Sequence, residues 1–248
     1  VTGEFTGTMN CGSGYNLVSE GVDGYLLKLN TDGTTIWTRQ FGGEGATKSK
    51  LVAVDNEGNI IVTGMVTSGT VYFGSNSHTI DDGMLDVFIL KYNGNGSLQW
   101  ETVYDGAYND RVNALCLTSS GNPVIAGKYN IDDFGVPQAG SIDFGGTAIS
   151  EGNCYLLSLN GSNGTTRWVY GNDMNILDIA LDINDNLLLA GNFSGTVNFS
   201  LTGTENRTSA GNGDAFVVTY NDLAQFQKVI TFGGSSDEYS LQIDVDLE

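Results

Sequence analysis

Short apolar runs recur along the whole chain, and turns rich in glycine, asparagine and aspartate separate them. Within most runs apolar and polar residues alternate with a period of two, which is typical of strands with one buried face. The polar turns between the runs predict hairpins. No segment shows the 3.6-residue period of an amphipathic helix, so the pattern predicts an all-β protein.

One unit is repeated four times, at spacings of 63, 67 and 61 residues. Its defining segment starts with aspartate or asparagine, ends with asparagine and aligns without a gap over 23–30, 86–93, 153–160 and 214–221. A tryptophan follows in the first three copies. A second strand in the unit carries paired glycines, such as Gly64 and Gly69, which predict bulges or close packing.

Each unit holds about four strands in ~60 residues. One four-stranded sheet cannot bury both of its faces, whereas sheets that stack radially bury both. The sequence therefore predicts an all-β β-propeller built from four repeats of ~62 residues, each with four strands. A linear β-solenoid is the alternative, but solenoid coils usually have only ~20 to 30 residues.

The two ends of the chain occupy the same position in the repeat, because the first three residues align with 62–64 and the last four with 54–57. We therefore expect a strand around 241–245 to complete the first sheet and to close the ring without an unpaired edge. The alternative is an arc of a larger propeller. In the closed ring, 1–248 is a single domain with blades at 1–40 plus 235–248, 41–103, 104–169 and 170–234. The start at Val1, without an initiator methionine or a signal-like segment, predicts a piece of a longer protein.

The residues that recur in each unit resemble a known family of repeats. The series runs Asp-Ala-Phe-Val-x-x-Tyr-Asn, then glycine and tryptophan, then Phe-Gly-Gly, then Val-Asp-x-x-Gly-Asn-Ile-x-Val-Thr-Gly. It is similar to the bacterial β-propeller repeat called SBBP over essentially the whole chain, although copies three and four depart at the tryptophan and Phe-Gly-Gly segments. The resemblance implies an extracytoplasmic module, secreted or on the cell surface of a bacterium, and carries over no catalytic or cofactor-binding residue.

The charge balance narrows the classes of partner. Ten basic and 29 acidic residues give a net charge of −19, which repels phosphate backbones and anionic headgroups. No apolar run reaches the ~18 residues of a membrane span. We therefore expect a soluble domain with a protein or glycan partner, no nucleic acid and no membrane insertion.

Cysteine and histidine offer little catalytic chemistry. Cys11, Cys116 and Cys154 align with core positions of the other copies, so we expect buried free thiols. His78 is the only histidine, and we expect a solvated loop side chain because no partner is positioned beside it. Trp37, Trp100 and Trp168 recur with the repeat, which favours packing between blades over a sugar-stacking platform.

Acidic turns are weak candidates for calcium. Asp182, Asn184 and Asn186 place oxygen side chains at alternate positions, as hard cations require. The same residues are ordinary in tight hairpin turns, and we favour that interpretation, with no cofactor. The aspartates that open the third strand of each copy recur too regularly for a catalytic site, so we expect them to hydrogen-bond the preceding loop.

Features that occur in one copy only are better guides to function, because residues that build each blade must recur. A nine-residue insertion at 131–139 contains Asp132, Asp133 and Phe134. Lys48 and Lys50 form a basic spot on an acidic protein. Both are candidate partner-binding segments, since binding residues concentrate in loops.

No convergent nucleophile, acid/base pair or metal cluster stands at single-copy positions. The sequence therefore predicts a non-catalytic binding or scaffold module that contacts a protein or glycan through its loop faces. The first alternative is a glycan-active hydrolase or lyase with Glu44, Asp110, Asp173 and Asp237 grouped at the propeller axis. The second is a structural spacer in a surface fibre.

Overall fold

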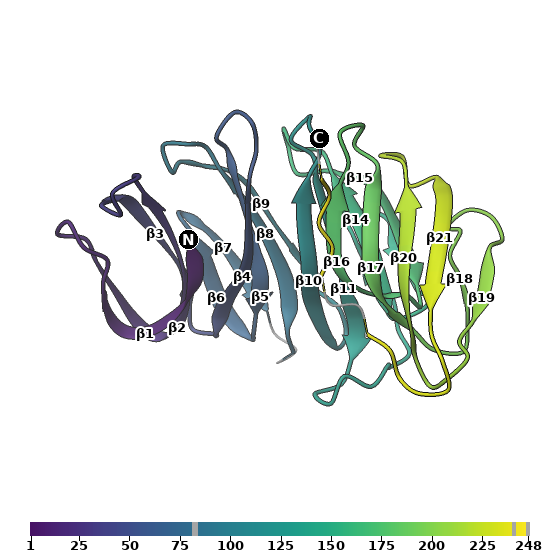
Figure 1. Cartoon of the computed structure of the whole chain (residues 1–248). Helices are drawn as coiled ribbons and strands as arrows, with labels where there is room; N and C mark the ends of the chain where they lie inside the picture. The colour runs from purple at the N-terminus through teal and green to yellow at the C-terminus, as the bar shows by residue number, and fades with distance from the viewer. Residues whose placement is uncertain (81–83, 240–241, 247–248) are drawn as a thin grey trace. The chain divides into compact units, whose positions relative to one another are not determined.

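The computed structural model describes residues 1–80, 84–239 and 242–246 (Figure 1). Within these ranges every regular element is a β-strand, and the strands pair in antiparallel ladders. The expectation of an all-β chain is confirmed. No helix in the described ranges is long and apolar enough to cross a membrane.

The chain divides into two compact units, 1–112 and 113–248. The first unit contains two sheets, with strand orders β1-β2-β3-β6-β7 and β4-β5-β8-β9. Their strands are β1 (Thr2–Asn10), β2 (Asn16–Leu29), β3 (Thr35–Gly43), β4 (Thr47–Val54), β5 (Ile60–Val66), β6 (Gly69–Phe73), β7 (Asn76–Ile80), β8 (Asp86–Tyr92) and β9 (Leu98–Tyr104).

The second unit contains two four-stranded sheets, β10-β11-β14-β15 and β16-β17-β20-β21, and two small hairpins. Strand β10 begins in the last residues of the first unit. The larger strands are β10 (Asn109–Leu117), β11 (Pro123–Ile131), β14 (Cys154–Leu159), β15 (Thr166–Asn172), β16 (Asn175–Leu181), β17 (Leu187–Phe193), β20 (Asp214–Tyr220) and β21 (Phe226–Phe232). The hairpins are β12 (Ile142–Asp143) with β13 (Ala148–Ile149), and β18 (Thr196–Asn198) with β19 (Asn206–Thr208).

In each four-stranded sheet, strands that follow one another are paired neighbours. Along the chain, a small hairpin is inserted between the second and the third strand. In the second copy the segment with the paired glycines is divided between two strands, β5 and β6. Gly69 opens β6 with a φ of 109°, a conformation that residues with a Cβ rarely adopt. In the first copy the strand stays continuous as β1, and Gly7 occupies a bulge with a φ of 66°. The second glycine therefore marks a bulge in the first copy and the start of a new strand in the second.

Burial follows position in the sheet. All residues of the third strands β8 and β14 are buried, whereas the outer strands β4 and β21 alternate with exposed positions. A strand buried on both faces lies in a sheet that is covered on both sides. This is the arrangement that stacked blades require.

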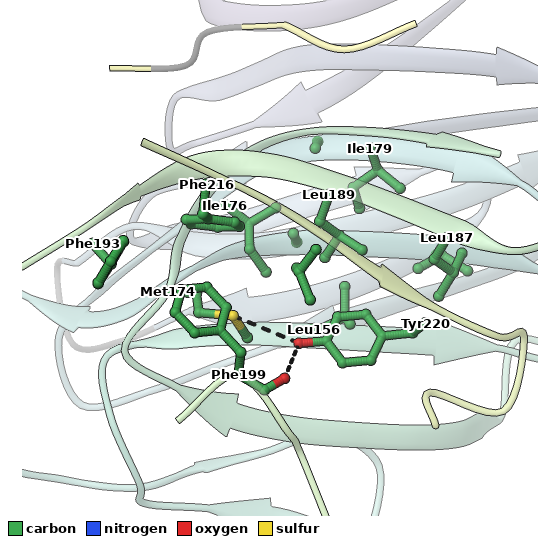
Figure 2. Close-up of a cluster of buried hydrophobic side chains, with 14 of the residues drawn as sticks. Leu156, Met174, Ile176, Ile179, Leu187, Leu189, Phe193, Phe199, Phe216 and Tyr220 are labelled. Atoms are coloured by element: carbon green, nitrogen blue, oxygen red, sulfur yellow. Dashed lines mark hydrogen bonds between the residues drawn. The ribbon is translucent and has the colours of Figure 1, made fainter. Parts of the chain in front are cut away.

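In the second unit one apolar core joins both large sheets (Figure 2). Leu156 of β14 packs with Leu189 and Phe216 of the neighbouring sheet. Figure 2 shows the hydroxyl of Tyr220 directed at the carbonyl oxygen of Phe199, to which it donates at 2.6 Å. The buried hydroxyl is thus satisfied, as burial of a polar atom requires.

In each unit, a tryptophan side chain of one sheet forms a hydrogen bond with the neighbouring sheet. Trp37 Nε1 donates to the carbonyl oxygen of Gly94 at 3.3 Å, and Trp168 Nε1 donates to that of Asp222 at 3.1 Å. In both cases the acceptor lies in the turn between the third and fourth strands of the next sheet. The predicted packing between sheets is confirmed for Trp37 and Trp168 and stays a prediction for Trp100.

The C-terminal segment differs from expectation. Residues 242–246 form no strand, and the Ile243 N–H donates to Asp178 Oδ2 of β16 at 2.9 Å. The predicted strand at 241–245 is therefore wrong over its described part, and position 241 lies outside the described residues. In a strand, the Ile243 N–H would donate to a backbone carbonyl of the neighbouring strand. Here it donates to the Asp178 side chain instead. The closed ring of four blades, its single domain and the larger arc stay predictions.

Candidate ligand-binding pocket

One hairpin turn recurs through the chain and also builds the insertion. Its first residue accepts hydrogen bonds from the backbone N–H groups two and four positions later, and the residue three positions later has a positive φ. The turn begins at Asn30, Asp55, Asn93, Asp132, Asp182 and Asn221. Asp132 thus closes the insertion into a short hairpin, which an isolated bridge between Ile131 and Pro137 completes.

The insertion hairpin presents an aromatic ring to solvent. Phe134, at its tip, is 93% exposed, and Asp133 beside it is exposed as well. Such exposure of a large apolar side chain is unusual away from binding surfaces. The three candidate residues Asp132, Asp133 and Phe134 therefore divide into one that builds the turn and two that face outwards.

The base of this hairpin lines a pocket of about 380 Å³ in the second unit. Ile131, Gly135 and Pro137 form its wall on the insertion side. The remaining wall is mainly polar, with one ammonium, one carboxylate and several amides, from Lys128, Asn153, Cys154, Asp173, Asn175, Asn192, Phe193, Ser194, Thr196 and Val197. The pocket thus combines a small apolar wall with donors and acceptors of both signs.

Two amides are fixed against one another inside the pocket. Asn175 Nδ2 donates to Asn192 Oδ1 at 2.7 Å, across the β16-β17 ladder. Asn175 Oδ1 is buried and has no hydrogen-bond partner among the described residues. Because buried polar atoms are normally paired, this oxygen is an acceptor available to a ligand.

The cysteine in the pocket is chemically quiet. Cys154 is buried, and burial raises its pKa to about 12, with Asp173 adding to the shift and Lys128 opposing it. Burial likewise raises the pKa of Cys11 and Cys116. A thiol with a raised pKa is a poor nucleophile and metal ligand. The prediction of free thiols is confirmed for all three, and that of full burial for Cys154 alone, since Cys11 and Cys116 are half-buried.

The calcium candidates lie in the recurring turn. Asp182 Oδ1 accepts from the N–H groups of Asn184 and Asn186 at 2.8 Å each, and Oδ2 accepts from Asn186 Nδ2 at 2.7 Å. Burial alone would raise the pKa of Asp182, but these hydrogen bonds outweigh it and lower the pKa. Both oxygens thus serve the turn, and in the described ranges no three His, Cys, Asp or Glu side chains are grouped to hold a metal ion. Calcium stays a prediction that this geometry does not support.

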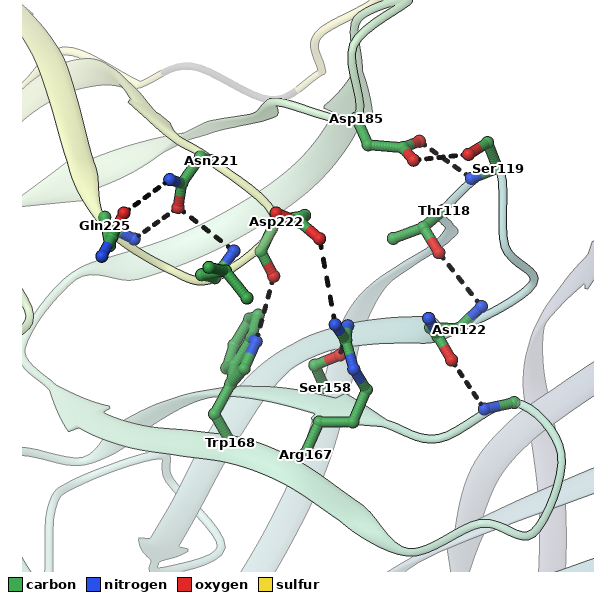
Figure 3. A network of polar contacts seen from close by, with 12 residues as sticks. Thr118, Ser119, Asn122, Ser158, Arg167, Trp168, Asp185, Asn221, Asp222 and Gln225 are labelled. Carbon is green, nitrogen blue, oxygen red and sulfur yellow. Dashed lines mark hydrogen bonds and ion pairs between the residues drawn. The ribbon is translucent and has the colours of Figure 1, made fainter.

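Neighbouring turns of the second unit also contact each other (Figure 3). The carboxylate of Asp185 accepts from both the N–H and the hydroxyl of Ser119, at 2.8 and 2.6 Å. Figure 3 shows Trp168 reaching the turn at Asp222, whose carboxylate also lies 3.9 Å from Arg167. The polar turns here join sheets to each other.

The basic candidates lie in the first unit. Lys48 is exposed on β4. Lys50 Nζ donates to the carbonyl oxygen of Val112 at 2.6 Å, and burial, with Arg111 nearby, lowers the pKa of its ammonium. Lys50 therefore has a structural partner within the protein, whereas Lys48 keeps its ammonium available as a candidate.

The acids of the hydrolase alternative have different environments. Glu44 is exposed, Asp110 is fully buried, Asp173 lines the pocket, and Asp237 follows β21 in a bridge with Gly213. Glycosidases use two carboxylates roughly 5 to 10 Å apart. Among the described residues that line the pocket, Asp173 is the single carboxylate.

The position of His78 corrects an expectation. It lies on strand β7, half-buried, with its ring 5.6 Å from that of Phe73 and its Nε2 3.6 Å from Glu101 Oε1. The sequence did not predict strand β7, because its five residues are mostly polar and too few to show an alternating pattern.

Sequence reasoning missed the polar wall of the pocket. Lys128 and Asn192 follow the recurring glycine of the second strand, where the other copies have Glu4 and Met65. This position differs in every copy while its glycine recurs. A search for variable positions beside invariant ones within the four copies would have found it.

Two comparisons with known proteins agree with the repeat. Residues 36–68, which span β3 to β5, match the family model of the SBBP β-propeller repeat. The chain is 24% identical over 237 residues to an uncharacterized WD repeat-containing protein of Acanthamoeba polyphaga mimivirus. That alignment covers 82% of this chain and 17% of the relative, so the chain corresponds to a small part of that protein's length. Both similarities are to propeller-type repeats, a class that serves widely as binding and scaffold folds.

Proposed function

We propose that the chain is a non-catalytic binding module that takes a glycan in the pocket beside the insertion hairpin. The single observation that carries this is the lining of that pocket: amides and two opposite charges beside a small apolar wall. Side-chain amides donate and accept hydrogen bonds at once, which suits the hydroxyl groups of a sugar. The volume of about 380 Å³ lies in the range of small-ligand sites.

Two further features support a glycan over a charged ligand. Lys128 and Asp173 offer one charge of each sign, so the pocket does not select a strong anion or cation. Phe134 is an exposed aromatic on the hairpin that forms the apolar wall, and aromatic faces pack against sugar rings. A protein partner on the loop faces, an extracytoplasmic location and a bacterial source stay predictions.

The test is a glycan array followed by calorimetric titration of the best ligand. Asn175→Ala removes the available acceptor and its bond to Asn192, and we expect binding to weaken about tenfold, the effect of about 1.4 kcal/mol. Asn56→Ala is the matched control, because Asn56 is an exposed amide in the β4-β5 turn of the first unit.

Failure of every glycan to bind, or equal binding by wild type and Asn175→Ala, contradicts the proposal. Release of reducing sugar by the wild type would instead favour the hydrolase alternative, and Asp173→Asn would then abolish it. Unchanged thermal unfolding of Asn175→Ala ensures that a loss of binding does not come from unfolding.

A further inference from the structure

The recurring aspartate of the third strand has a repeated task. Asp214 accepts hydrogen bonds from the N–H groups of Ala210 and Gly211, at 3.0 and 3.3 Å, and so ties down the loop before it. Asp86 accepts from the Gly106 N–H at 3.2 Å. The predicted hydrogen bond to the preceding loop is therefore confirmed for Asp214, whereas Gly106, which donates to Asp86, follows the fourth strand β9.

Asp23 in the first copy departs from this pattern. The residues before it belong to the long strand β2, whose ladder with β1 continues to Asn10 and Asn16, so no separate loop covers the carboxylate. Its Oδ2 accepts from Gln40 Nε2 at 2.6 Å. Its Oδ1 has no hydrogen-bond partner among the described residues, although Asp23 is only 6% exposed.

Gln40 is itself particular to the first copy. The residue before the aromatic of the Phe-Gly-Gly turn is apolar or hydroxylic in the other copies, as Val103, Val169 and Thr231. Gln40 Nε2 donates to the carbonyl oxygen of Val18 as well as to Asp23, at 2.7 and 2.6 Å. Its donors are thus occupied, and a free acceptor remains on Asp23.

Asp23 lines a second pocket, of about 320 Å³, in the first unit. Glu20 and Glu44 also line it, and no basic side chain is among its lining residues in the described structure. The Thr70 N–H donates to Glu44 Oε2 at 3.1 Å and holds that carboxylate at the rim. The apolar part of the rim consists of Val18, 64% exposed, and Tyr72, 50% exposed.

This arrangement favours a cation. A buried carboxylate oxygen without a partner is costly, and two further carboxylates around the same pocket add like-charge repulsion. A bound positive charge would relieve both. The acids are not grouped tightly enough for a single metal ion, because no three such side chains in the described ranges meet around one point. The ligand is therefore better matched by an extended cation with several donors and an apolar stem.

We propose that this pocket binds an arginine side chain of a partner polypeptide, with its guanidinium donating to Asp23 Oδ1 and flanked by Glu20 and Glu44. A guanidinium presents several N–H donors in a fixed plane, and its aliphatic stem packs on Val18 and the Tyr72 ring. The net charge of −19 steers basic partners towards the chain. The site lies in the other unit from the glycan pocket and does not depend on it.

The test uses two capped pentapeptides, Gly-Gly-Arg-Gly-Gly and the same peptide with citrulline, which keeps the shape of arginine but is uncharged. We titrate each into the ¹⁵N-labelled full chain and follow the amide signals of Gly42, Gly43 and Glu44. Saturable shifts with the arginine peptide alone are expected. Equal shifts with both peptides, or none with either, overturn the proposal, as do shifts with Ca²⁺ when the arginine peptide has no effect.

Variants then locate the charge that matters. Asp23→Asn removes the charge of the carboxylate. The fold accommodates asparagine here, because the third copy has Asn153 at the equivalent position. We expect the affinity for the arginine peptide to fall at least about tenfold. Glu44→Gln, at an exposed position, gives a smaller loss in the same direction. Glu57→Gln, an exposed acid in the β4-β5 turn, is the matched control and keeps wild-type binding. Wild-type affinity in Asp23→Asn, or the same loss in Glu57→Gln, contradicts the proposal.

Discussion

At the scale of single residues, the aspartate of the third strand lies against a glycine at the end of the fourth strand in the first and fourth copies. A Cβ added to Gly233 would stand 2.0 Å from Cγ of Asp214, and one added to Gly42 would stand 2.2 Å from Oδ1 of Asp23. Real Cβ atoms do not approach so closely, so each glycine leaves the space that the carboxylate fills. In the first and fourth copies the glycine after the aromatic residue therefore leaves room for the aspartate of the third strand.

This pairing predicts that Gly233→Ala destabilises the protein. The Asp214 carboxylate cannot retreat without losing its hydrogen bonds to Ala210 and Gly211, so we expect a loss of about 1 to 3 kcal/mol in the free energy of unfolding. Urea denaturation followed by circular dichroism measures it. Gly21→Ala is the control, because a Cβ there meets nothing within 4 Å, and its effect should stay within about 0.5 kcal/mol. Equal stabilities of the two variants would contradict this explanation.

At this scale the sequence predicted roles that recur and missed those that do not. The aspartates, the tryptophans and the free thiols follow from alignment of the four copies, because equivalent positions meet equivalent neighbours. The free acceptor of Asp23 depends on the absence of a covering loop, and that of Asn175 on a contact with Asn192 of the next strand. Neither is visible until the strands are paired in space.

At the scale of elements, the hairpin turn is the unit that repeats most faithfully. The side-chain oxygen of its first residue accepts hydrogen bonds from two backbone N–H groups. Aspartate and asparagine both supply such an oxygen, so either residue can form the turn. Asn93 and Asn221 make the same two hydrogen bonds as Asp55 and Asp182. The strands were predictable from their period and the turns from their composition. The small hairpins β12-β13 and β18-β19 were not predictable, because strands of two or three residues are too short to show an alternating pattern.

The turn predicts an acid-sensitive contribution to stability. Burial opposes the shift, but hydrogen bonds lower the pKa of Asp182 below its ordinary value of 3.8, so the ionised form is favoured in the folded state. This stability is present above pH 3.8 and is lost as the pH falls through the folded-state pKa. We expect Asp182→Asn to be less stable than the wild type at pH 7, and we expect the difference to shrink as the pH falls from 3.8 to 2.

Urea unfolding at the two pH values tests the turn. Asp32→Asn is a useful comparison in the first unit, because hydrogen bonds from Thr34 also lower the pKa of Asp32. A difference between wild type and Asp182→Asn that persists undiminished at pH 2 would mean that the substitution acts through shape and not through charge.

At the scale of the whole chain, two kinds of position have separate tasks. Residues that recur in the four copies build buried strands, turns and contacts between sheets, and the repeat could be predicted from them. Residues that occur once, such as Gln40, Lys128 and Asn175, line the two pockets. Both proposed sites therefore lie where the copies differ. The sequence shows these positions as variable, but it does not show that they surround a cavity.

The net charge of −19 is the last property that belongs to the chain as a whole, and it predicts that salt stabilises the fold. Folding brings 29 acidic and 10 basic residues into a small volume, so their repulsion is stronger in the folded than in the unfolded state. Sodium chloride shortens the screening length from about 30 Å at 0.01 M to about 10 Å at 0.1 M. We expect the melting temperature to rise over this range, where specific salting-out is weak. Isomolar sucrose is the control for solute effects without charge. A melting temperature that falls with salt would mean that local ion pairs and charged hydrogen bonds outweigh the repulsion of the acidic excess.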